Sequence, residues 1–424
     1  MRTLVSELSS RIGETVTLSG WVHRVRDLGG VSFVVLRDRS GMAQLVFDSR
    51  PEVTPESVIQ VEGAAAANEK APGGVEVRVA RLTMIAPAAP DLPFPVNQDP
   101  GKTSLESILD NRMLSVRNPA ILSIFRLQAT ILRCFAEHLR GEGFTEIKTS
   151  KLVGTGTEGG TNLFAVEYFD SKVYLSQSPQ LYKQVMIASG LERVFEIGPA
   201  YRAEKHDTPR HINEFESLDV EMGFIESEQD LMDLETRILA AIFDGIRRNN
   251  QRDLEAWKAE APDPSLCPRI PRVSHDEARE IVSKETGKKV YEIGPEGERA
   301  LCDWAGRTAG IEAAFVYAYP RRSRPFYTHP AENNKTRAFD LLFRGLEITS
   351  GGMRINQHDM LVESAKTFGL DPAGLSDYLT IFRYGCPPHG GFAIGLERLT
   401  QKVLGLGSVK EAALFPRDRK RTRP

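Results

Sequence analysis

The chain has 424 residues, 41% hydrophobic and 26% charged, with a formal net charge of −3. This length favours two domains, and the composition is typical of a soluble globular protein. Four cysteines without C-x-x-C spacing exclude a zinc ribbon and disfavour a disulfide framework. No apolar run is expected to span a membrane, and the N-terminal MRTLVSELSS lacks a signal peptide's apolar stretch. These features predict a cytoplasmic protein.

Residues 1–88 are predicted to form a small all-β barrel of the OB type. Turn residues separate five β-rich runs, which are TVTLSGWVHRV, VSFVVLRDRSG, AQLVFD, VIQVEGAAA and VEVRVARLTMIA. An aromatic side chain, Phe33, lies between Arg24, Arg26 and Arg37 in sequence, a combination that favours binding of single-stranded nucleic acid. A barrel with no such role fits the same alternation.

A proline-rich segment separates this barrel from the rest of the chain. Five prolines between positions 87 and 100 predict a stiff linker or hinge over 89–117. Asn118 and Pro119 are typical of a helix start, and apolar residues recur at helical spacing down to Gly141. The second domain is predicted over 118–424, with a polar insertion at about 252–307.

The next glycine-rich stretch, Gly154 to Gly159, satisfies G-x-G-x-x-G, but the β-branched TNLFAVEYF that follows excludes a dinucleotide-binding turn. Ser178-Pro179 predicts the start of a helix that ends at Gly190. Gln180 and Lys183 are three residues apart and therefore share a face of that helix.

Residues 194–224 are predicted to form a β-hairpin with one charged face. Arg202 and Glu204 leave the same side of the first strand, and Phe215 and Asp219 share a side of the second. An exposed Phe215 among acidic residues indicates a flat, charged ligand. A surface hairpin with one solvated face is the simpler alternative.

The C-terminal third contains a predicted strand, AFDLLFRGLEITSGGMRI, that ends at a Gly-Gly bend. Glu347 and Ser350 offer the hard oxygens that Mg²⁺ prefers, and Arg354 suits a carboxylate. A surface ion pair between Glu347 and Arg354 is the alternative. In GGFAIGLERLTQKVLG, Gly395 allows close backbone approach and Arg398 opens a helix whose N-terminus favours phosphate. A P-loop motif is absent from the sequence.

The R-x-E, its loop and the closing H-x-x-E-F resemble motif 2 of class II aminoacyl-tRNA synthetases. F-E-S-L-D-V-E-M is similar to the aspartyl branch (subclass IIb) in its archaeal-type form. The helix from Pro119 with FTEIKT resembles motif 1, although Ser150 stands where the family usually has Pro, and GGFAIGLERLTQKVLG resembles motif 3. The resemblance implies an α+β catalytic domain built on a mostly antiparallel sheet, an N-terminal OB-fold anticodon-binding domain, and a homodimer.

The resemblance also implies roles for individual residues. It implies that Arg202 and Arg398 catalyse the reaction by charge stabilisation. The residues expected to bind ATP are Arg202, Glu204, Arg210, His211, Phe215, Glu347, Gly395 and Arg398. Glu347 and Ser350 are expected to bind Mg²⁺. The substrate aspartate falls to Glu158, Gln180, Lys183, Arg202, Asp219, Ser350 and Arg354. Anticodon contacts fall on Arg26, Phe33, Gln44 and Glu76.

Two further residues resemble the subgroup that charges both tRNA-Asp and tRNA-Asn. His23 stands where strict archaeal-type enzymes tend to have Trp, and Pro72 where they tend to have Lys. The expected function is ATP-dependent aspartylation of both tRNAs, with an amidotransferase completing asparagine on the second. A strict tRNA-Asp enzyme is the alternative, followed by a tRNA-free aspartate ligase or a silent tRNA-binding paralogue. The barrel argues against the first of these two, and Arg202, Glu347 and Arg398 argue against the second.

Overall fold

The computed structural model describes residues 2–154, 163–205 and 207–424, which form two compact units, Met1–Asn118 and Pro119–Pro424. The first unit is built on five strands that close into a barrel in the order β1-β2-β3-β5-β4. The strands are β1 (Thr15–Asp27), β2 (Ser32–Arg37), β3 (Met42–Phe47), β4 (Val58–Ala67) and β5 (Val75–Ala86). They match the five runs predicted from alternation, and the predicted OB barrel is confirmed.

Alternation works well in this barrel because each strand buries one face and leaves the other partly exposed. In β3 the buried and partly exposed residues alternate without interruption. The buried side chains form one apolar core that includes Leu18, Val34, Leu45 and Val61. After the barrel, residues 87–99 form no helix or strand, whereas α1 (Leu105–Asp110) and α2 (Arg112–Ser115) occupy the segment that leads to Asn118.

The second unit is organised around an eight-stranded sheet with the order β12-β13-β16-β17-β18-β11-β10-β6. All neighbours are antiparallel except β12 with β13 and β10 with β6. This arrangement confirms the predicted mostly antiparallel α+β domain. The strands of the sheet are β6 (Thr145–Glu146), β10 (Arg193–Tyr201), β11 (Glu214–Gly223), β12 (Arg272–Ser274), β13 (Ala313–Tyr317), β16 (Ala338–Phe343), β17 (Leu346–Arg354) and β18 (His389–Gly395).

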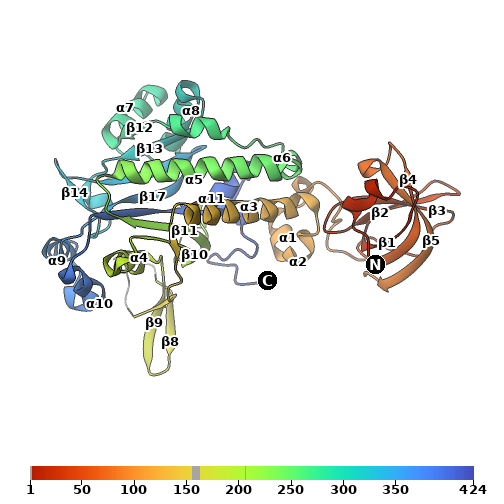
Figure 1. Ribbon diagram of the computed structural model, residues 1–424, viewed down its shortest axis with the longest axis horizontal. Helices are drawn as coiled ribbons and strands as arrows, with labels where there is room; N and C mark the ends of the chain where they lie inside the picture. Colours follow the sequence, from red (N-terminus) through yellow and green to blue (C-terminus); the bar gives the residue numbers. More distant parts are fainter. Residues whose placement is uncertain (1, 155–162, 206) are drawn as a thin grey trace. The chain divides into compact units, whose positions relative to one another are not determined.

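Helices and two small sheets complete the unit. The small sheets contain β7 (Leu152–Val153), β8 (Ala165–Tyr168) and β9 (Ser171–Leu175), and separately β14 (Pro330–Ala331) and β15 (Lys335–Thr336). The helices are α3 (Pro119–Gly141), α4 (Gln180–Met186), α5 (Glu228–Asn249), α6 (Gln251–Ala256), α7 (His275–Thr286), α8 (Pro295–Ala309), α9 (His358–Thr367), α10 (Ser376–Leu379), α11 (Leu396–Leu404) and α12 (Val409–Ala412). In Figure 1, α3 and α5 run side by side across the middle of the unit, and the β8–β9 hairpin projects on the side away from α7 and α8.

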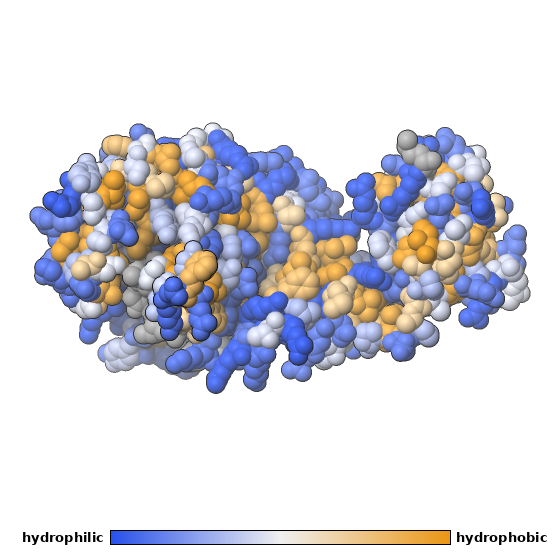
Figure 2. All heavy atoms as spheres, turned by 90° about the horizontal axis from the view of Figure 1, so that it is seen from below, coloured by the Kyte–Doolittle hydropathy of each residue, from blue (hydrophilic) through white to orange (hydrophobic). Residues whose placement is uncertain are grey.

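The sequence was not expected to contain a segment apolar enough to cross a membrane. By length and composition alone, helix α3 is such a segment, so that expectation was wrong. Its 23 residues pass such a test, with 56% of the most apolar window buried inside the unit. Ile124, Leu127 and Ile131 belong to the main core together with residues of α5 and the sheet. The apolar character of α3 is therefore explained by burial in this unit. On the face shown in Figure 2, hydrophilic side chains separate the apolar patches.

Two local expectations were also wrong. β10 ends at Tyr201, so Arg202 and Glu204 lie in the following loop rather than on the strand. The predicted Gly-Gly bend is absent, because Gly351 and Gly352 lie inside β17. A Cβ at Gly351 would lie 2.6 Å from the Cβ of Phe392, and one at Gly352 would lie 2.7 Å from the Cα of Ala338. These glycines allow neighbouring strands to approach closely rather than turning the chain.

The buried carboxyl group of Glu235 on α5 gives the second unit a predicted pH dependence. Neither carboxyl oxygen has a well-aligned hydrogen-bond partner among the described residues. Burial raises the pKa of Glu235 from 4.5 to about 8, although the nearby Thr349 hydroxyl lowers it in part. The folded protein therefore keeps a proton that the unfolded chain releases above about pH 4.5, and this contribution to stability is lost as the pH rises to about 8.

We expect Glu235→Gln, which cannot ionise, to remove this pH dependence. Relative to wild type, the variant should gain roughly 4 kcal/mol of unfolding free energy between pH 5 and 9, from about 1.4 kcal/mol per unit of pKa shift. Denaturant unfolding of both proteins across that range measures the difference. Exposed Glu280 on α7 supplies the control, Glu280→Gln, which should follow wild type. If the unfolding free energies of wild type and Glu235→Gln changed in parallel with pH, the raised pKa of Glu235 would be contradicted.

Candidate active site

A cavity of about 310 Å³ lies on the open face of the large sheet. Its wall collects residues far apart in sequence, from α4, the β10–β11 hairpin, β17, β18 and α11. Most of the residues selected from the sequence line it, namely Gln180, Arg202, Glu204, Arg210, His211, Phe215, Asp219, Glu347, Ser350, Arg354, Gly395 and Arg398. Lys183 is not part of the wall and is only 2% exposed. Glu158 lies outside the described residues.

A fully buried carboxylate that the sequence did not single out for any role, Glu221 on β11, contacts Arg354 of the cavity wall without lining the cavity itself. The Nε atom of Arg354 lies 3.0 Å from one carboxylate oxygen, and Nζ of Lys183 lies 3.3 Å from the other. Burial alone would raise the pKa of Glu221, but Arg354 and Lys183 outweigh it and hold this pKa below its usual value. The two predicted substrate-binding cations therefore converge on one carboxylate of the protein itself.

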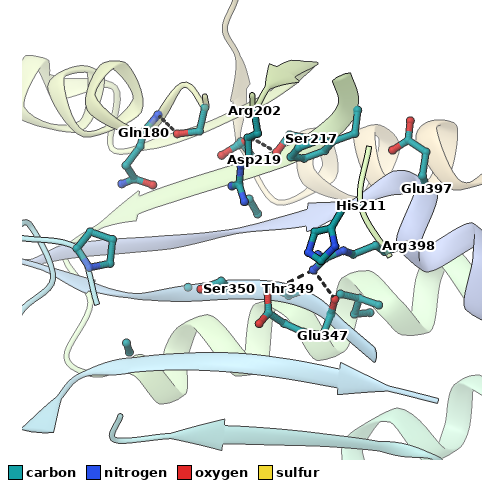
Figure 3. Close-up of a pocket in the computed structure, with 18 of the residues that line it drawn as sticks. Gln180, Arg202, His211, Ser217, Asp219, Glu347, Thr349, Ser350, Glu397 and Arg398 are labelled. Carbon is teal, nitrogen blue, oxygen red and sulfur yellow. Dashed lines mark hydrogen bonds and ion pairs between the residues drawn. The ribbon is translucent and has the colours of Figure 1, made fainter. Parts of the chain in front are cut away.

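Asp219, two residues before Glu221, shares one of these cations. Lys183 donates to its Oδ1 at 3.0 Å, and the hydroxyl of Ser217 donates to Oδ2 at 2.6 Å. Gln180 joins the same group because its Oε1 accepts from Arg354 at 3.2 Å. These contacts leave Asp219 on the cavity wall with a defined orientation (Figure 3).

The loop after β10 brings a cation over an aromatic ring. The guanidinium of Arg202 lies 5.3 Å from the ring centre of Phe215, and the backbone N–H of Arg202 donates to Asn213 at 2.8 Å. This places both side chains on the same wall although Arg202 is outside the strand. Nδ1 of His211 lies 2.7 Å from the hydroxyl of Thr208.

The polar segment around 252–307 also contacts this loop. Its helix α8 carries Glu298, which forms an ion pair with Arg210. The same segment contributes β12 to the edge of the large sheet. A predicted ATP-binding arginine is therefore held by a residue for which the sequence suggested no task.

The opposite wall contains Glu347, Ser350 and Arg398. Arg398 donates to the backbone oxygen of Glu347 at 2.9 Å and approaches its carboxylate at 3.4 Å. Burial, followed by repulsion from Asp340, raises the pKa of Glu347 to about 7. In Figure 3, His211 and Arg398 lie between this wall and the side that carries Arg202 and Asp219.

Asp340 on β16 is a functional candidate that sequence reasoning missed. It pairs with Ser350 in the β16–β17 register, and its charge acts on the carboxylate of Glu347. Arg324 joins the two by donating to Asp340 at 2.8 Å and to the Ser350 hydroxyl at 3.0 Å. The spacing of the two acids across the Arg344-Gly345 turn was the available sequence signal.

These oxygens suit a hard divalent cation that takes its remaining ligands from phosphate and water. No cluster of three or more His, Cys, Asp or Glu residues suited to a metal occurs in the described parts of the chain. A cation here would therefore depend on a bound nucleotide for part of its coordination.

Glu397, beside Arg398, is a further residue that sequence reasoning missed. Its carboxylate oxygens both lie 3.2 Å from the backbone nitrogen of Glu216. Burial raises the pKa of Glu397 to about 8. It ties the start of α11 to β11, and so fixes the two walls relative to each other.

The barrel of the first unit carries the predicted nucleic-acid residues in two rows across neighbouring strands. Arg26 pairs with Phe33 in the β1–β2 register, and Gln44 pairs with Glu76 between β3 and β5. The amide of Gln44 donates to the carboxylate of Glu76 at 3.1 Å. Adjacent strands therefore present an arginine with an aromatic ring, and an amide with a carboxylate.

The two residues linked to tRNA choice occupy different environments in this unit. His23 lies at a bulge of β1, is 8% exposed and has Nδ1 2.9 Å from Arg37. Burial and then Arg37 lower the pKa of His23 to about 4, so its ring is neutral at pH 7. Pro72 is exposed in the turn between β4 and β5.

Both units match known protein families. Residues 104–419 match the model of class II tRNA synthetases (D, K and N), and residues 16–85 match that of OB-fold nucleic acid binding domains. The aspartate–tRNA(Asp/Asn) ligases of Deinococcus radiodurans and Thermus thermophilus are 47% and 46% identical, over 100% of this chain and 99% and 100% of theirs. A crystal structure of asparaginyl-tRNA synthetase from Pyrococcus horikoshii with asparaginyl-adenylate has a TM-score of 0.92 at 32% identity, with full coverage of both chains.

We expect Glu221→Gln to destabilise the second unit, because Lys183 and Arg354 would lose the charge between them. Breaking a buried ion pair costs about 3–5 kcal/mol, whereas an exposed pair contributes about 0–1 kcal/mol. Denaturant unfolding at pH 7 measures the loss. Glu137→Gln, which breaks the exposed pair with Arg133 on α3, is the matched control and should change stability little. Similar small losses in both variants would show that Glu221 does not stabilise the site.

Proposed function

The chain belongs to the class II aminoacyl-tRNA synthetases of the Asp, Lys and Asn group, and on this premise we propose that it aspartylates both tRNA-Asp and tRNA-Asn. The reaction uses ATP and passes through an aspartyl-adenylate. Transfer to tRNA-Asn supplies the substrate of an amidotransferase that completes asparagine. We assign the enzyme to the cytoplasm and expect a homodimer.

The charge balance around Lys183 and Arg354 is the observation that supports aspartate. With Arg202, these residues supply three positive charges against the negative charges of Asp219 and Glu221. Aspartate carries one net negative charge and neutralises this surplus, whereas asparagine carries none. The substrate ammonium group would pair with Asp219, which frees Lys183 to meet the side-chain carboxylate beside Arg354. An amide there would leave Glu221 as the one carboxylate shared by Lys183 and Arg354, and this incomplete charge balance disfavours binding.

In the first step, an α-carboxylate oxygen of aspartate attacks the α-phosphorus of ATP and pyrophosphate leaves. Arg202 would hold the α-phosphate and the carboxylate, Phe215 would stack on adenine, and Glu204 would accept from the adenine amino group. Arg398, with His211 and Arg210 near it, would bind the outer phosphates. Catalysis then depends on positioning and charge stabilisation rather than on a protein nucleophile.

Glu347 and Ser350, with Asp340 beside them, would hold Mg²⁺ on the phosphates of the nucleotide. When bound, Mg²⁺ neutralises charge that develops on the phosphate oxygens. Gly395 would let the backbone lie close to the nucleotide. We assign Glu158 to closing the aspartate site from the glycine-rich loop.

In the second step, a hydroxyl of the tRNA 3′-terminal ribose attacks the aspartyl carbonyl carbon and AMP leaves. The barrel would bind the anticodon, with Phe33 stacking on a base and Arg26, Gln44 and Glu76 contacting base edges. A neutral, buried His23 and an uncharged Pro72 would leave the third anticodon base without a discriminating contact. A strict tRNA-Asp enzyme is the alternative if these two positions do not decide the choice.

We expect the purified enzyme to charge transcripts of tRNA-Asp and tRNA-Asn with aspartate at comparable rates, in the presence of Mg-ATP. Aspartate-dependent pyrophosphate exchange should occur without tRNA, and asparagine should not replace aspartate in it. Charging of tRNA-Asp alone would establish the strict alternative. Absence of both charging and exchange would overturn the assignment as a synthetase.

We expect Pro72→Lys to reduce charging of tRNA-Asn by about tenfold, the effect of about 1.4 kcal/mol, while charging of tRNA-Asp stays near wild type. The turn is exposed, so the substitution should not disturb the barrel. The ratio of kcat/KM for the two tRNAs is the measurement. Ala80→Lys places the same charge at another exposed barrel position and is the control. Equal loss with both tRNAs would count against a role in discrimination.

A further inference from the structure

The loop between β10 and β11 supplies much of the wall of the active-site cavity, although its described residues form neither helix nor strand. The residues of this loop that line the cavity are Arg202, Glu204, Arg210, His211 and Ile212. We propose that Lys410 on α12 is a positioning residue for ATP binding, because it ties this loop to the C-terminal tail (residues 414–424). The proposal rests on the function proposed above, in which the loop binds the nucleotide.

Open space lies on both sides of the first part of this loop. Glu204 lines the first cavity, that of the active site, and also a second cavity of about 700 Å³. Ala203 and Lys205 belong to the wall of the second cavity. Packing against a core therefore does not fix this part of the loop, and its position depends on individual polar contacts.

The ammonium group of Lys410 bridges the loop and the tail. Its Nζ lies 2.7 Å from Oδ1 of Asp207 in the loop and 2.6 Å from Oδ2 of Asp418 in the tail. Burial alone would lower the pKa of Lys410, but its hydrogen bonds to the two carboxylates outweigh burial and raise this pKa. The side chain is only 15% exposed, so water screens this bridge less than it screens ion pairs on the open surface.

Both supports of the ammonium group are fixed by contacts outside the loop. In the tail, Oδ1 of Asp418 accepts the backbone N–H groups of Lys420 and Arg421, each at 2.8 Å. At the end of α12, the backbone oxygen of Ala412 accepts from the side chain of Gln128 on α3 at 2.6 Å. The bridge therefore connects the loop to a helix and a carboxylate whose positions do not depend on the loop.

Backbone hydrogen bonds join the loop to the same two segments. Asn213 donates its N–H to the oxygen of Arg417 in the tail at 2.7 Å, and its own oxygen accepts from Arg202 at 2.8 Å. Val409 on α12 donates its N–H to the oxygen of Pro209 at 2.8 Å. The backbone contacts thus hold the second half of the loop, and the ammonium bridge holds it at residue 207.

Helix α12 also supports the ring that is proposed to stack on adenine. Ile212, Val409 and Ala413 form a small buried cluster, and Phe215 packs against it. Since the guanidinium of Arg202 lies over the same ring, a loop that moved away from α12 would displace contacts to both the adenine and the α-phosphate. The side chains proposed to bind the aspartate side chain lie on α4 and β17 and would stay in place.

The test measures aspartate-dependent pyrophosphate exchange, which needs no tRNA, for Lys410→Met and Asp207→Asn. Each variant removes the charge-assisted hydrogen bond between loop and helix, so we expect KM for ATP to rise about tenfold in each. The KM for aspartate should stay near wild type. The double variant should show no larger effect than Lys410→Met alone, because both substitutions remove one interaction. Lys288→Met, which breaks an exposed ion pair with Glu296, is the control and should match wild type.

The loop-side variant separates positioning of the loop from support of the tail. If Lys410 only stabilised the tail through Asp418, Asp207→Asn would leave KM for ATP unchanged, and the proposal would be overturned. Equal increases in KM for ATP and for aspartate would also overturn it, because they would indicate a general disturbance of the site. Asp207 is exposed, so its substitution keeps the test decisive even if Lys410→Met unfolds. A wild-type enzyme without exchange would instead refute the proposed function itself.

Discussion

The carboxylate of Glu221 joins the parts of the active site that come from distant segments of the chain. It lies on β11, contacts Lys183 from α4 and Arg354 from the end of β17, and is fully buried. Arg354 also donates to the backbone oxygen of Gly391 on β18 at 3.0 Å. One buried charge therefore fixes the positions of both cations, because each would be left unpaired in a low-dielectric interior if the register of these strands changed.

Glycine on β18 makes this arrangement possible. A Cβ at Gly391 would lie 2.0 Å from the oxygen of Val220 and 2.2 Å from the carboxylate of Glu221, so no other residue fits without displacing the network. A Cβ at Gly351 on β17 would lie 2.6 Å from the Cβ of Phe392 and 2.8 Å from the backbone oxygen of Gly391. Gly351 and Gly391 therefore allow the central strands to pack closely around Glu221. The buried ion pairs depend on the absence of side chains at these positions as much as on the charges.

Strands and helices could be predicted from the sequence wherever one hydrophobic periodicity dominated. Residues whose role depends on contacts between several elements could not be predicted. The barrel strands followed from alternation, and the motif-bearing residues that line the first cavity followed from resemblance to a family. Glu221 continued the charged alternation of Phe215, Ser217 and Asp219, and nothing local indicated that two cations would meet it. Asp340 and Glu397 are similar cases, because their importance depends on the register with β17 and on the backbone of Glu216. Burial in tertiary structure, rather than residue type, distinguishes them from surface acids.

Under the proposed function, the charges around Glu221 would let the site be stable when empty and still select a charged substrate. Without substrate, Lys183 is shared between Asp219 and Glu221, and Arg354 is held by Glu221 and Gln180. No buried cation is left without a partner in this group, so the empty cavity carries little cost. A ligand that brings both an ammonium group and a carboxylate can exchange partners with Asp219 and Lys183 without leaving any charge unpaired. An amino acid with a neutral side chain brings no second carboxylate for Lys183 and Arg354, so under the proposed function this exchange selects for an acidic side chain.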